Sequence, residues 1–259
     1  MRLLVDFLCR FGWGLSAALV ITPAALVPAG FFRVNMLVVL GLATFAALLG
    51  SQMPPTAGWT LPAAAAVTAW LGSIAWYAER VQAGRLFCAA CAILLAAATA
   101  VVHGSAAGTL AGGLTAAPLP LLSGLVTGLT VHAMLLGHWY LNAPGMRVDV
   151  LRRMIDAALV AWAVQLVATL AIAAMVPGYP LSPAALFASI GSVTAASQTA
   201  VALLWLRWLA GLVGLPVLLW LARETLKIPN TQSATGILYV ACLAAILGEL
   251  TAQLLTAAA

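Results

Sequence analysis

Long apolar segments, separated by short polar or turn-forming stretches, dominate the pattern along the chain. A helix needs about 20 predominantly apolar residues to cross the hydrocarbon core of a bilayer. On this criterion the sequence predicts about eight transmembrane helices, with seven and nine as alternatives. The predicted segments are Phe11–Gly30, Asn35–Leu49, Trp59–Tyr77, Leu86–Val102, Leu119–Tyr140, Met154–Val176, Ala195–Ala222 and Ala234–Leu255.

Proline and glycine mark several connections between these segments. They occur at 53–55, 143–145, 177–180 and 228–230, where the hydropathy also drops. Such residues commonly end helices, so they support the predicted boundaries. Pro216 falls inside the seventh and longest segment, and we expect it to kink that helix.

Small residues are concentrated in two places. Residues 103–118, between the fourth and fifth segments, are almost all small, which fits either a loop on the outer face or a short re-entrant piece. Within the fifth segment, Gly124 and Gly128 lie four residues apart, a spacing that lets helix backbones approach closely. The two halves of the chain show no convincing repeat of the kind on which many transporters are built.

The basic residues predict how the helices cross the membrane. Loops rich in Lys and Arg stay in the cytoplasm. Basic residues follow the first, third, fifth and seventh segments, whereas Arg2 and Arg10 lie on the opposite side. The pattern therefore predicts extracytoplasmic termini, although the two arginines near the N-terminus do not fit it. The residues on the predicted cytoplasmic side are Arg33, Arg80, Arg85, Arg147, Arg152, Arg153, Arg223 and Lys227.

Composition supports this fold class and excludes several functions. Hydrophobic residues make up 64% of the chain and charged residues 7%, whereas a soluble domain carries about 25% charged residues. The sequence predicts an all-α integral membrane protein, a single polytopic domain over residues 1–259 in a bacterial-type inner (plasma) membrane. The lack of a long polar stretch excludes ordinary nucleic-acid binding and P-loop ATP hydrolysis. Asp6 and Arg10 interrupt the first apolar run, so we expect no cleaved signal peptide.

Two charged residues lie deep within predicted helices, Arg207 in the seventh and Glu249 in the eighth. Each charge at a helix centre costs about 2.5–3.5 kcal/mol or more. By helical rise, both lie on the order of 22 Å from the cytoplasmic surface. Consecutive antiparallel helices usually pack together, so we expect an Arg207–Glu249 ion pair. Two roles fit it, a structural clamp and a binding or proton site.

The three histidines are poorly placed for a shared haem. His132 and His138 lie six residues apart on one predicted helix, so their side chains point about 120° away from each other. His103 lies at the opposite membrane face. This arrangement disfavours bis-histidine haem. For His132 two roles remain, a single ligand to haem or a chlorophyll-like pigment, and a polar side chain hydrogen-bonded between helices.

A quinone headgroup needs a hydrogen-bond donor, a nearby proton acceptor and an apolar slot, and two sets of residues supply them. Helix capping is the other interpretation of the residues just before the eighth helix, because Asn, Thr and Ser are favoured there. The set at the cytoplasmic level comprises Gln232, Ser233, His138 and Asn142. The deeper set comprises Glu249, Gln253, Gln165 and Gln198.

The four cysteines lie in or beside apolar segments, so we expect no disulfide framework. Cys88 and Cys91 form a CxxC pair on one helical face. No histidine or acidic residue accompanies them, which favours packing over redox or metal chemistry. We expect no metal site and no catalytic residues, because the sequence lacks motifs such as HExxH, GxSxG and CxxCH.

These features favour an integral membrane subunit of a larger respiratory or electron-transfer complex. It would anchor partner subunits in the bilayer and could bind quinone or conduct protons, as a non-catalytic part of an oxidoreductase rather than a stand-alone enzyme. The expected plan is similar to that of the quinol-handling anchor subunits of molybdenum oxidoreductases, such as the polysulfide-reductase type. This similarity is one of plan and involves no sequence motif. The alternatives are a secondary transporter of a small solute and a purely structural scaffold.

Overall fold

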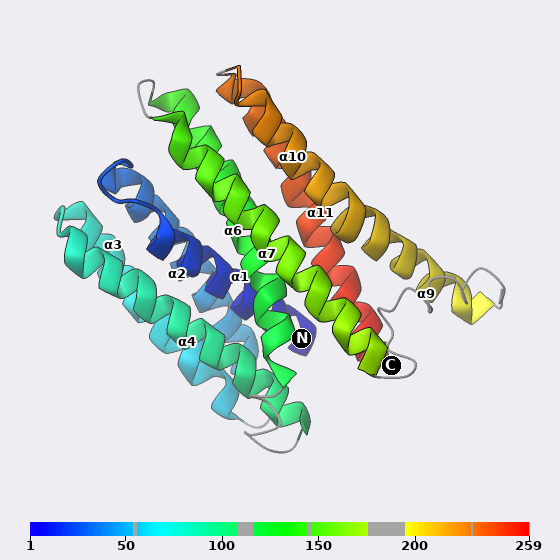
Figure 1. Cartoon of the computed structure of the whole chain (residues 1–259). Coiled ribbons are helices and arrows are strands. Elements are labelled where there is room, and N and C mark those ends of the chain that lie inside the picture. Colours follow the sequence, from blue (N-terminus) through cyan, green and yellow to red (C-terminus); the bar gives the residue numbers. More distant parts are fainter. Residues whose placement is uncertain (54–55, 108–115, 144–146, 176–194, 229, 259) are drawn as a thin grey trace.

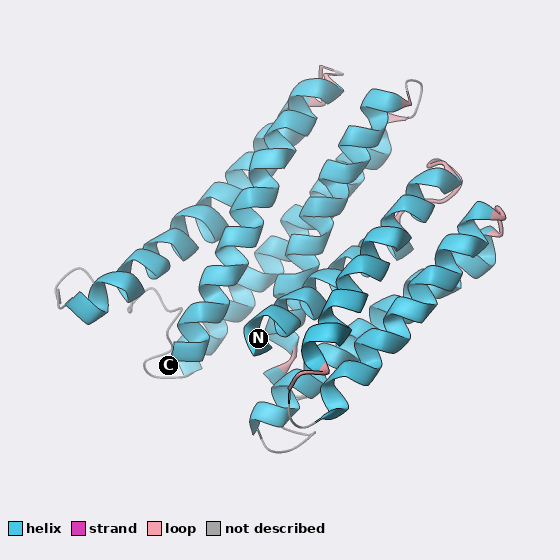
Figure 2. Ribbon diagram, turned by 180° about the vertical axis from the view of Figure 1, so that it is seen from behind, coloured by secondary structure: helices cyan, strands magenta, loops and turns pink. Residues whose placement is uncertain are grey.

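The computed structural model describes residues 1–53, 56–107, 116–143, 147–175, 195–228 and 230–258, and these residues form helices and connecting loops without a strand (Figures 1 and 2). The helices are α1 (Arg2–Ile21), α2 (Ala29–Gly50), the short 3-10 helix η1 (Thr56–Trp59), α3 (Thr60–Tyr77), α4 (Val81–Ala107), α6 (Pro118–Asn142), α7 (Val148–Met175), α9 (Ala195–Leu206), the π-helix η2 (Arg207–Gly214), α10 (Leu215–Thr225) and α11 (Thr231–Ala258).

The long helices run alongside one another in a bundle. Helix α1 packs against α2, α4 and α6, and α6 in turn packs against α7 and α11. The chain begins and ends at the same end of the bundle, which we call the terminal end (Figure 1). The opposite end, called the basic end, carries the connections after α1, α3, α6 and α10. The predicted cytoplasmic arginines and lysine lie near these connections, and none of them is buried.

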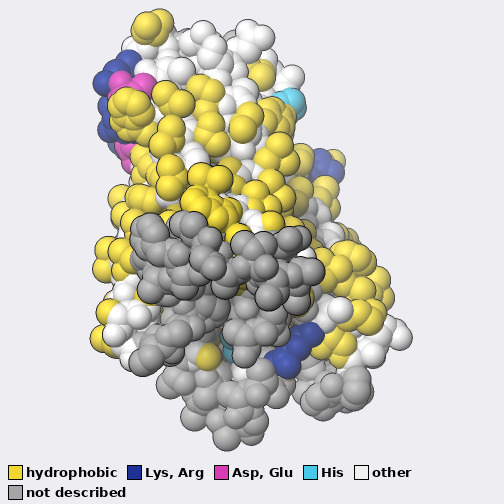
Figure 3. Space-filling view, turned by 90° about the vertical axis from the view of Figure 1, so that its right-hand side faces the viewer, with side chains coloured by type: hydrophobic (Ala, Val, Ile, Leu, Met, Phe, Trp, Pro, Cys, Tyr) yellow, Lys and Arg dark blue, Asp and Glu magenta, His cyan; other side chains and the backbone are white. Residues whose placement is uncertain are grey.

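Length and composition show a multi-pass membrane protein. Seven described helical stretches are long and apolar enough to cross a membrane. Helix α3, with 18 residues, is not among them but packs against α2 and α4. Large apolar side chains such as Val160, Leu86 and Leu243 are exposed, and hydrophobic side chains cover much of the described face in Figure 3. The prediction of an all-α polytopic bundle is confirmed.

The first helix differs most from its prediction. It spans Arg2–Ile21 rather than Phe11–Gly30, so the predicted position is wrong. Asp6 and Arg10 lie one helical turn apart and form an ion pair, which lets both charges enter the helix. Residues 22–28 form a loop bounded by prolines; Thr22, which precedes a proline, has extended backbone angles of φ −71° and ψ 127°.

The seventh predicted segment is one helical stretch that changes its winding. It begins as α9, becomes the π-helix η2 and returns to α-helix as α10. Pro216, in the first turn of α10, lacks an amide hydrogen, so it cannot donate the backbone hydrogen bond that an α-helix makes to the preceding turn. Gly214 lies where a Cβ atom would be 2.6 Å from the Leu209 carbonyl oxygen. The interruption expected at the proline is therefore a widened helix just before it.

Glycines bring α1 and α6 into backbone contact. A Cβ atom on Gly128 would lie 2.5 Å from Gly14 Cα, and one on Gly124 would lie 2.8 Å from the Arg10 carbonyl carbon. The spacing of Gly124 and Gly128 thus corresponds to a tight helix crossing. This crossing fixes α1 against α6 and sets the position of Arg10 in the terminal half of the bundle.

The helices on the other side of α1 are held by apolar packing. Phe32 stacks on Trp76, with ring centroids 4.2 Å apart. Cys88 and Cys91 are both fully buried; the Cys88 thiol contacts the Met36 sulfur at 3.5 Å. All four cysteines are free thiols. The CxxC pair accordingly lies within the packed core, as its lack of polar neighbours suggested.

Candidate functional site: a buried charge cluster and its cavities

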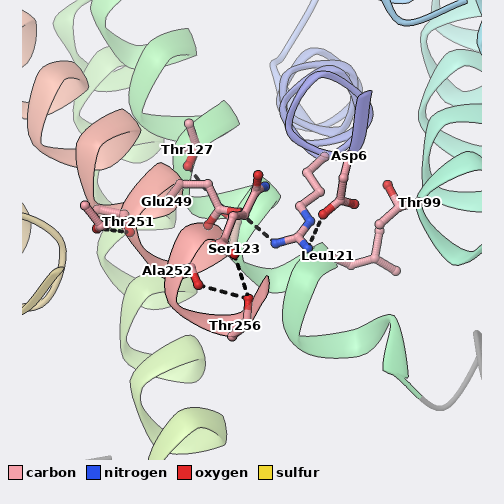
Figure 4. Close-up of polar contacts among 12 residues, drawn as sticks. Asp6, Thr99, Leu121, Ser123, Thr127, Glu249, Thr251, Ala252 and Thr256 are labelled. Carbon is pink, nitrogen blue, oxygen red and sulfur yellow. Dashed lines mark hydrogen bonds and ion pairs between the residues drawn. The ribbon is translucent and has the colours of Figure 1, made fainter. Parts of the chain in front are cut away.

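Arg10 is the centre of a buried charge cluster in the terminal half. Its Nη1 atom donates a hydrogen bond to Glu249 Oε1 at 2.7 Å, and its Nη2 atom pairs with Asp6 on the preceding turn of α1. Arg10 is 8% exposed, Asp6 5% and Glu249 2%. Figure 4 shows the two carboxylates approaching from opposite sides, Asp6 from α1 and Glu249 from α11. One guanidinium therefore joins the first and last helices of the chain.

Glu249 and Arg207 come close to each other, but the ion pair of Glu249 is with Arg10. Arg207 Nη1 donates to the carbonyl oxygen of Gly248 at 3.3 Å, and Arg207 and Glu249 line the same cavity. The expected Arg207–Glu249 pair is not among the ion pairs of the described residues. Counting residues along the two helices placed Arg207 and Glu249 at one level of the membrane, and both line one cavity. Such counting could not show that α1 also brings a cation, Arg10, to Glu249.

The approach of Arg207 to α11 depends on two glycines. A Cβ atom on Gly248 would lie 2.6 Å from Gly211 Cα, and one on Gly211 would lie 2.7 Å from Arg207 Nη1. Both glycines are therefore needed for the close crossing of η2 and α11. Arg207 is the first residue of the π-helix, a type of segment that is frequent at functional sites.

His103 extends the cluster from α4. Arg10 Nη2 lies 3.1 Å from His103 Nε2, and His103 Nδ1 lies 3.0 Å from the Thr99 carbonyl oxygen. Arginine can only donate and a carbonyl can only accept. Both contacts are satisfied by a neutral imidazole with its proton on Nδ1. Asp6 Oδ1 lies 3.6 Å from the same Nδ1 atom, so His103 connects α4 to both charges of α1.

Gln253 completes the surroundings of Glu249 on α11. Its Nε2 atom donates to Glu249 Oε1 at 2.9 Å, the same oxygen that accepts from Arg10. Glu249 Oε2 is buried and has no hydrogen-bond partner among the described residues. A buried carboxylate oxygen without a donor is costly, so this atom is the natural attachment point for a proton, a water molecule or a ligand donor.

Two adjoining cavities lie around the cluster. The inner cavity, of about 340 Å³, is lined by both polar and apolar groups. The second cavity, which we call the vestibule, has about 460 Å³ and reaches the first turn of α1 at Arg2 and Leu3. Arg10, His103 and Thr256 line both. The polar lining of the inner cavity includes Arg10, His103, Ser123, Gln165, Thr169, Arg207, Glu249 and Thr256.

The two candidate quinone sets are far apart in the structure. Gln165 and Glu249 line the inner cavity and Gln253 lines the vestibule. The side chain of Gln198 lies outside the described part, as do residues 108–115 of the small-residue stretch. Residues 103–107 of that stretch continue α4 as helix. The set at the opposite end comprises Gln232, Ser233, His138 and Asn142, all exposed.

The exposed set at the basic end has local partners. Asn230 Oδ1 accepts a hydrogen bond from the Ser233 amide at 3.0 Å, which is helix N-capping. Tyr239 lies with its hydroxyl 3.3 Å from His138 Nδ1, and Asn142 donates to the His138 carbonyl at 3.2 Å. The bond from Ser233 to Asn230 supports the capping interpretation at the start of α11.

His132 has the environment of a hydrogen-bonded core residue. It is fully buried, and its Nε2 atom lies 2.7 Å from the Thr22 hydroxyl. The same hydroxyl lies 2.7 Å from the Ala18 carbonyl oxygen. It donates to that carbonyl when the ring carries its proton on Nε2, and to the ring when Nε2 has no proton. Phe31 packs edge-on at 5.3 Å between ring centroids. Of the two roles considered for His132, these contacts favour the bond between helices over ligation of a haem or pigment.

Asp156 pairs with a residue that is distant in sequence. Arg152 and Arg153 precede it on α7, but Arg223 of α10 forms an ion pair with Asp156. The side chains of both residues are partly exposed at the basic end, so this pair joins α7 to α10 near the membrane surface.

Sequence reasoning missed three members of the charge cluster: Asp6, Arg10 and His103. Asp6 and Arg10 looked like an interruption of an apolar run, which moved the predicted helix past them. Their spacing of four residues within that run was the available signal, because residues at i and i+4 share a helical face. His103 carried no comparable signal, since its partners lie on α1 and one turn earlier on α4.

Comparison of the chain with known protein families, with curated proteins and with solved structures gives no match. The functional argument therefore depends on the geometry of the cluster and its cavities.

Proposed function

We propose that the protein is a membrane subunit of an electron-transfer complex and binds a quinone headgroup in the inner cavity. The observation that carries the proposal is the mixed polar and apolar lining of that cavity. Glu249, Gln165 and Arg207 offer proton-accepting and hydrogen-bonding groups, whereas Leu119 and Ile172 offer apolar surface. A volume of about 340 Å³ falls within the range of small-molecule sites, about 300–1,000 Å³.

The high helical content of the described residues fits a role that needs partner subunits. The described connections between helices are short, and nearly all described residues belong to helices. Electrons for quinone chemistry at this cavity would therefore come from a partner subunit. In this proposal the protein lies in a bacterial-type inner membrane with its basic end in the cytoplasm, so that the cavity faces the extracytoplasmic side.

A photoreactive quinone analogue tests the site directly. After illumination of membranes, the label is expected on residues 118–123 or 249–256, and excess natural quinone should compete with it. Gln165→Ala is expected to weaken binding about fivefold to tenfold, since one net hydrogen bond is worth about 1–1.5 kcal/mol. Gln232→Ala at the basic end is the matched control and should bind normally. Labelling confined to the basic end would contradict the proposal.

Co-purification tests whether the protein belongs to an electron-transfer complex. Mass spectrometry of the native protein in mild detergent should find cytochrome, iron–sulfur or molybdenum subunits in stoichiometric amounts. A pure homo-oligomer would contradict membership of an electron-transfer complex, whatever the result of quinone labelling.

A secondary transporter is the second candidate, because the vestibule connects the buried charges with one end of the bundle. Transport also requires access from the other end, and there Leu215, Leu219 and Leu238 are buried in the packed core. Solute flux in proteoliposomes that is lost in Glu249→Gln would favour transport. Intact assembly and turnover without Glu249 would favour a structural scaffold.

A further inference from the structure

We propose that the vestibule and the inner cavity form a water-filled half-channel that carries protons between the terminal end of the bundle and Glu249. The inference deepens the proposed function, because it gives the same site a proton route. It stands on the two cavities, which share three lining residues, and on the position of one carboxylate, and neither depends on the identity of the ligand.

The two cavities lie next to each other and share polar lining residues. The vestibule starts at Arg2 and Leu3 and shares Arg10, His103 and Thr256 with the inner cavity. Thr256 is exposed. A polar space with several hydrogen-bonding groups holds water readily, because each water molecule needs about two to four polar partners. The cavity volumes far exceed the space that a single water molecule needs.

Glu249 is positioned to exchange a proton with this water. Its Oε1 atom accepts from both Arg10 and Gln253, which holds the carboxyl group in place. Its Oε2 atom has no hydrogen-bond partner among the described residues, and Glu249 lines the inner cavity. Oε1 therefore has two donors, whereas Oε2 has none among the described residues and is the oxygen on which a proton would be stabilising.

The charges around Glu249 make its protonation state matter. The cluster contains two carboxylates, Asp6 and Glu249, and two guanidinium groups, Arg10 and Arg207. Arginine stays charged in proteins, so the carboxylates and His103 are the groups that can change charge. With both carboxylates ionised and His103 neutral, the cluster is balanced, and one added proton leaves a net positive charge. The charged and hydrogen-bonding groups that contact Glu249 or line the two cavities include Arg2, Asp6 and Arg10 on α1, His103 on α4, Ser123 on α6, Gln165 on α7, Arg207 on η2 and Gln253 on α11.

The route ends at Glu249 in the described residues. Beyond it, the next cavity toward the basic end has only about 10 Å³. On α11 the buried positions toward the basic end include Ala245, Ala241 and Leu238. The Cys242 thiol, also buried there, donates to the Thr130 carbonyl oxygen, so its donor already has a partner. Access from one end and a tightly packed barrier toward the other define a half-channel rather than a pore.

Cysteine accessibility tests the water route. In a background with the four native cysteines replaced by serine or alanine, Ser123→Cys and Thr256→Cys place a thiol in the inner cavity and at its shared rim. A charged, membrane-impermeant methanethiosulfonate should modify both from the terminal end. Thr130→Cys is the matched control. It is buried seven residues further along α6, lines none of these cavities, and should react at least about tenfold more slowly.

Two outcomes would overturn the water route. One is an unreactive Ser123→Cys while Gln52→Cys, exposed near the same end, reacts normally. The other is equal modification of Ser123→Cys from both ends, which would show a through channel. Neither outcome depends on whether a quinone binds, so failure of the quinone assay and failure of this inference are distinguishable.

Infrared difference spectroscopy tests the proton. A pH step should produce a protonated-carboxyl band that is lost in Glu249→Gln, a variant that keeps an oxygen acceptor for Arg10. Asp6→Asn should retain this band. No pH-dependent carboxyl band assignable to Glu249 would overturn its role as the proton group of the half-channel.

Discussion

The two ends of the bundle use charged residues in opposite ways. At the terminal end, Asp6, Arg10 and Glu249 are buried and contact one another across α1 and α11. At the basic end, pairs such as Arg147–Asp149 are largely exposed. Exposed pairs contribute about 0–1 kcal/mol, whereas breaking a buried pair costs several kcal/mol. The comparison indicates that charge at the basic end needs no specific partner, while charge at the terminal end requires a specific three-dimensional arrangement.

Two of the histidines repeat this difference. His103 contacts charged groups and borders two cavities, whereas His132 contacts a hydroxyl and an aromatic ring in the packed core. The same residue type thus belongs to a polar, accessible site at one level of the bundle and to core packing at another. Variants that perturb one part of the bundle at a time test whether the two ends are independent.

Arg10→Leu is expected to have the largest effect. It removes the cation shared by Asp6 and Glu249 and leaves two buried carboxylates, at a cost of about 3–5 kcal/mol. Glu249→Leu leaves Arg10 paired with Asp6 and should cost less. Unfolding in mixed micelles measures both, with exposed Arg85→Leu as the control at about ±0.5 kcal/mol. Equal losses for Arg10→Leu and Glu249→Leu would show that Arg10 does not hold the cluster together.

Gly128→Ala tests the helix crossing that positions the cluster. The added Cβ atom would lie 2.5 Å from Gly14 Cα, so two backbones must separate, at a cost of about 3 kcal/mol. Gly41→Ala is the matched control, because nothing lies within 4 Å of the added atom. That change should stabilise the helix by about 0.5–1 kcal/mol. A Gly128→Ala protein as stable as the Gly41→Ala protein would rule out the tight crossing.

Thr22→Val tests the core role of His132. It removes the hydroxyl at His132 Nε2 and should cost about 1.5 kcal/mol through an unsatisfied buried group. The double variant Thr22→Val/His132→Leu should lose less stability than the sum of the two single changes. Visible absorbance of the purified protein distinguishes the two roles of His132. A haem or pigment band that disappears in His132→Leu would favour ligation.

Asn230→Ala should have the smallest effect. It removes the side-chain acceptor for the Ser233 amide, and loss of such a cap costs about 1 kcal/mol. Because the cap lies at the basic end, quinone labelling and cysteine accessibility at Ser123 should stay unchanged. An altered inner cavity in this variant would show that the two ends are coupled.

Hydropathy predicted most helices because the bilayer imposes one length on all of them. The predicted Trp59–Tyr77 and Leu119–Tyr140 segments differ by at most two residues at either end from α3 and α6. The rule failed at α1, where it treats every charge as a boundary. An ion pair within one turn cancels much of that cost, so the helix includes Asp6 and Arg10.

The site was harder to predict than the helices, because pairing depends on contacts between distant segments. Depth along two consecutive helices placed Arg207 and Glu249 at one level, and both line the inner cavity. Depth could not identify Arg10 as the cation nearest to Glu249, since the two are separated by 239 positions. Nor could composition identify η2, because its π winding reflects backbone geometry just before Pro216.

The pairing of Arg10 with Glu249 also sets an order for biosynthesis. The ribosome makes α1 well before α11, and at about 5–20 residues per second the 239 positions that separate Arg10 from Glu249 take on the order of 10–50 s. During this interval α1 has Asp6 as the counter-charge for Arg10 but lacks Glu249. Full pairing of Arg10 is therefore a late step in the assembly of the bundle.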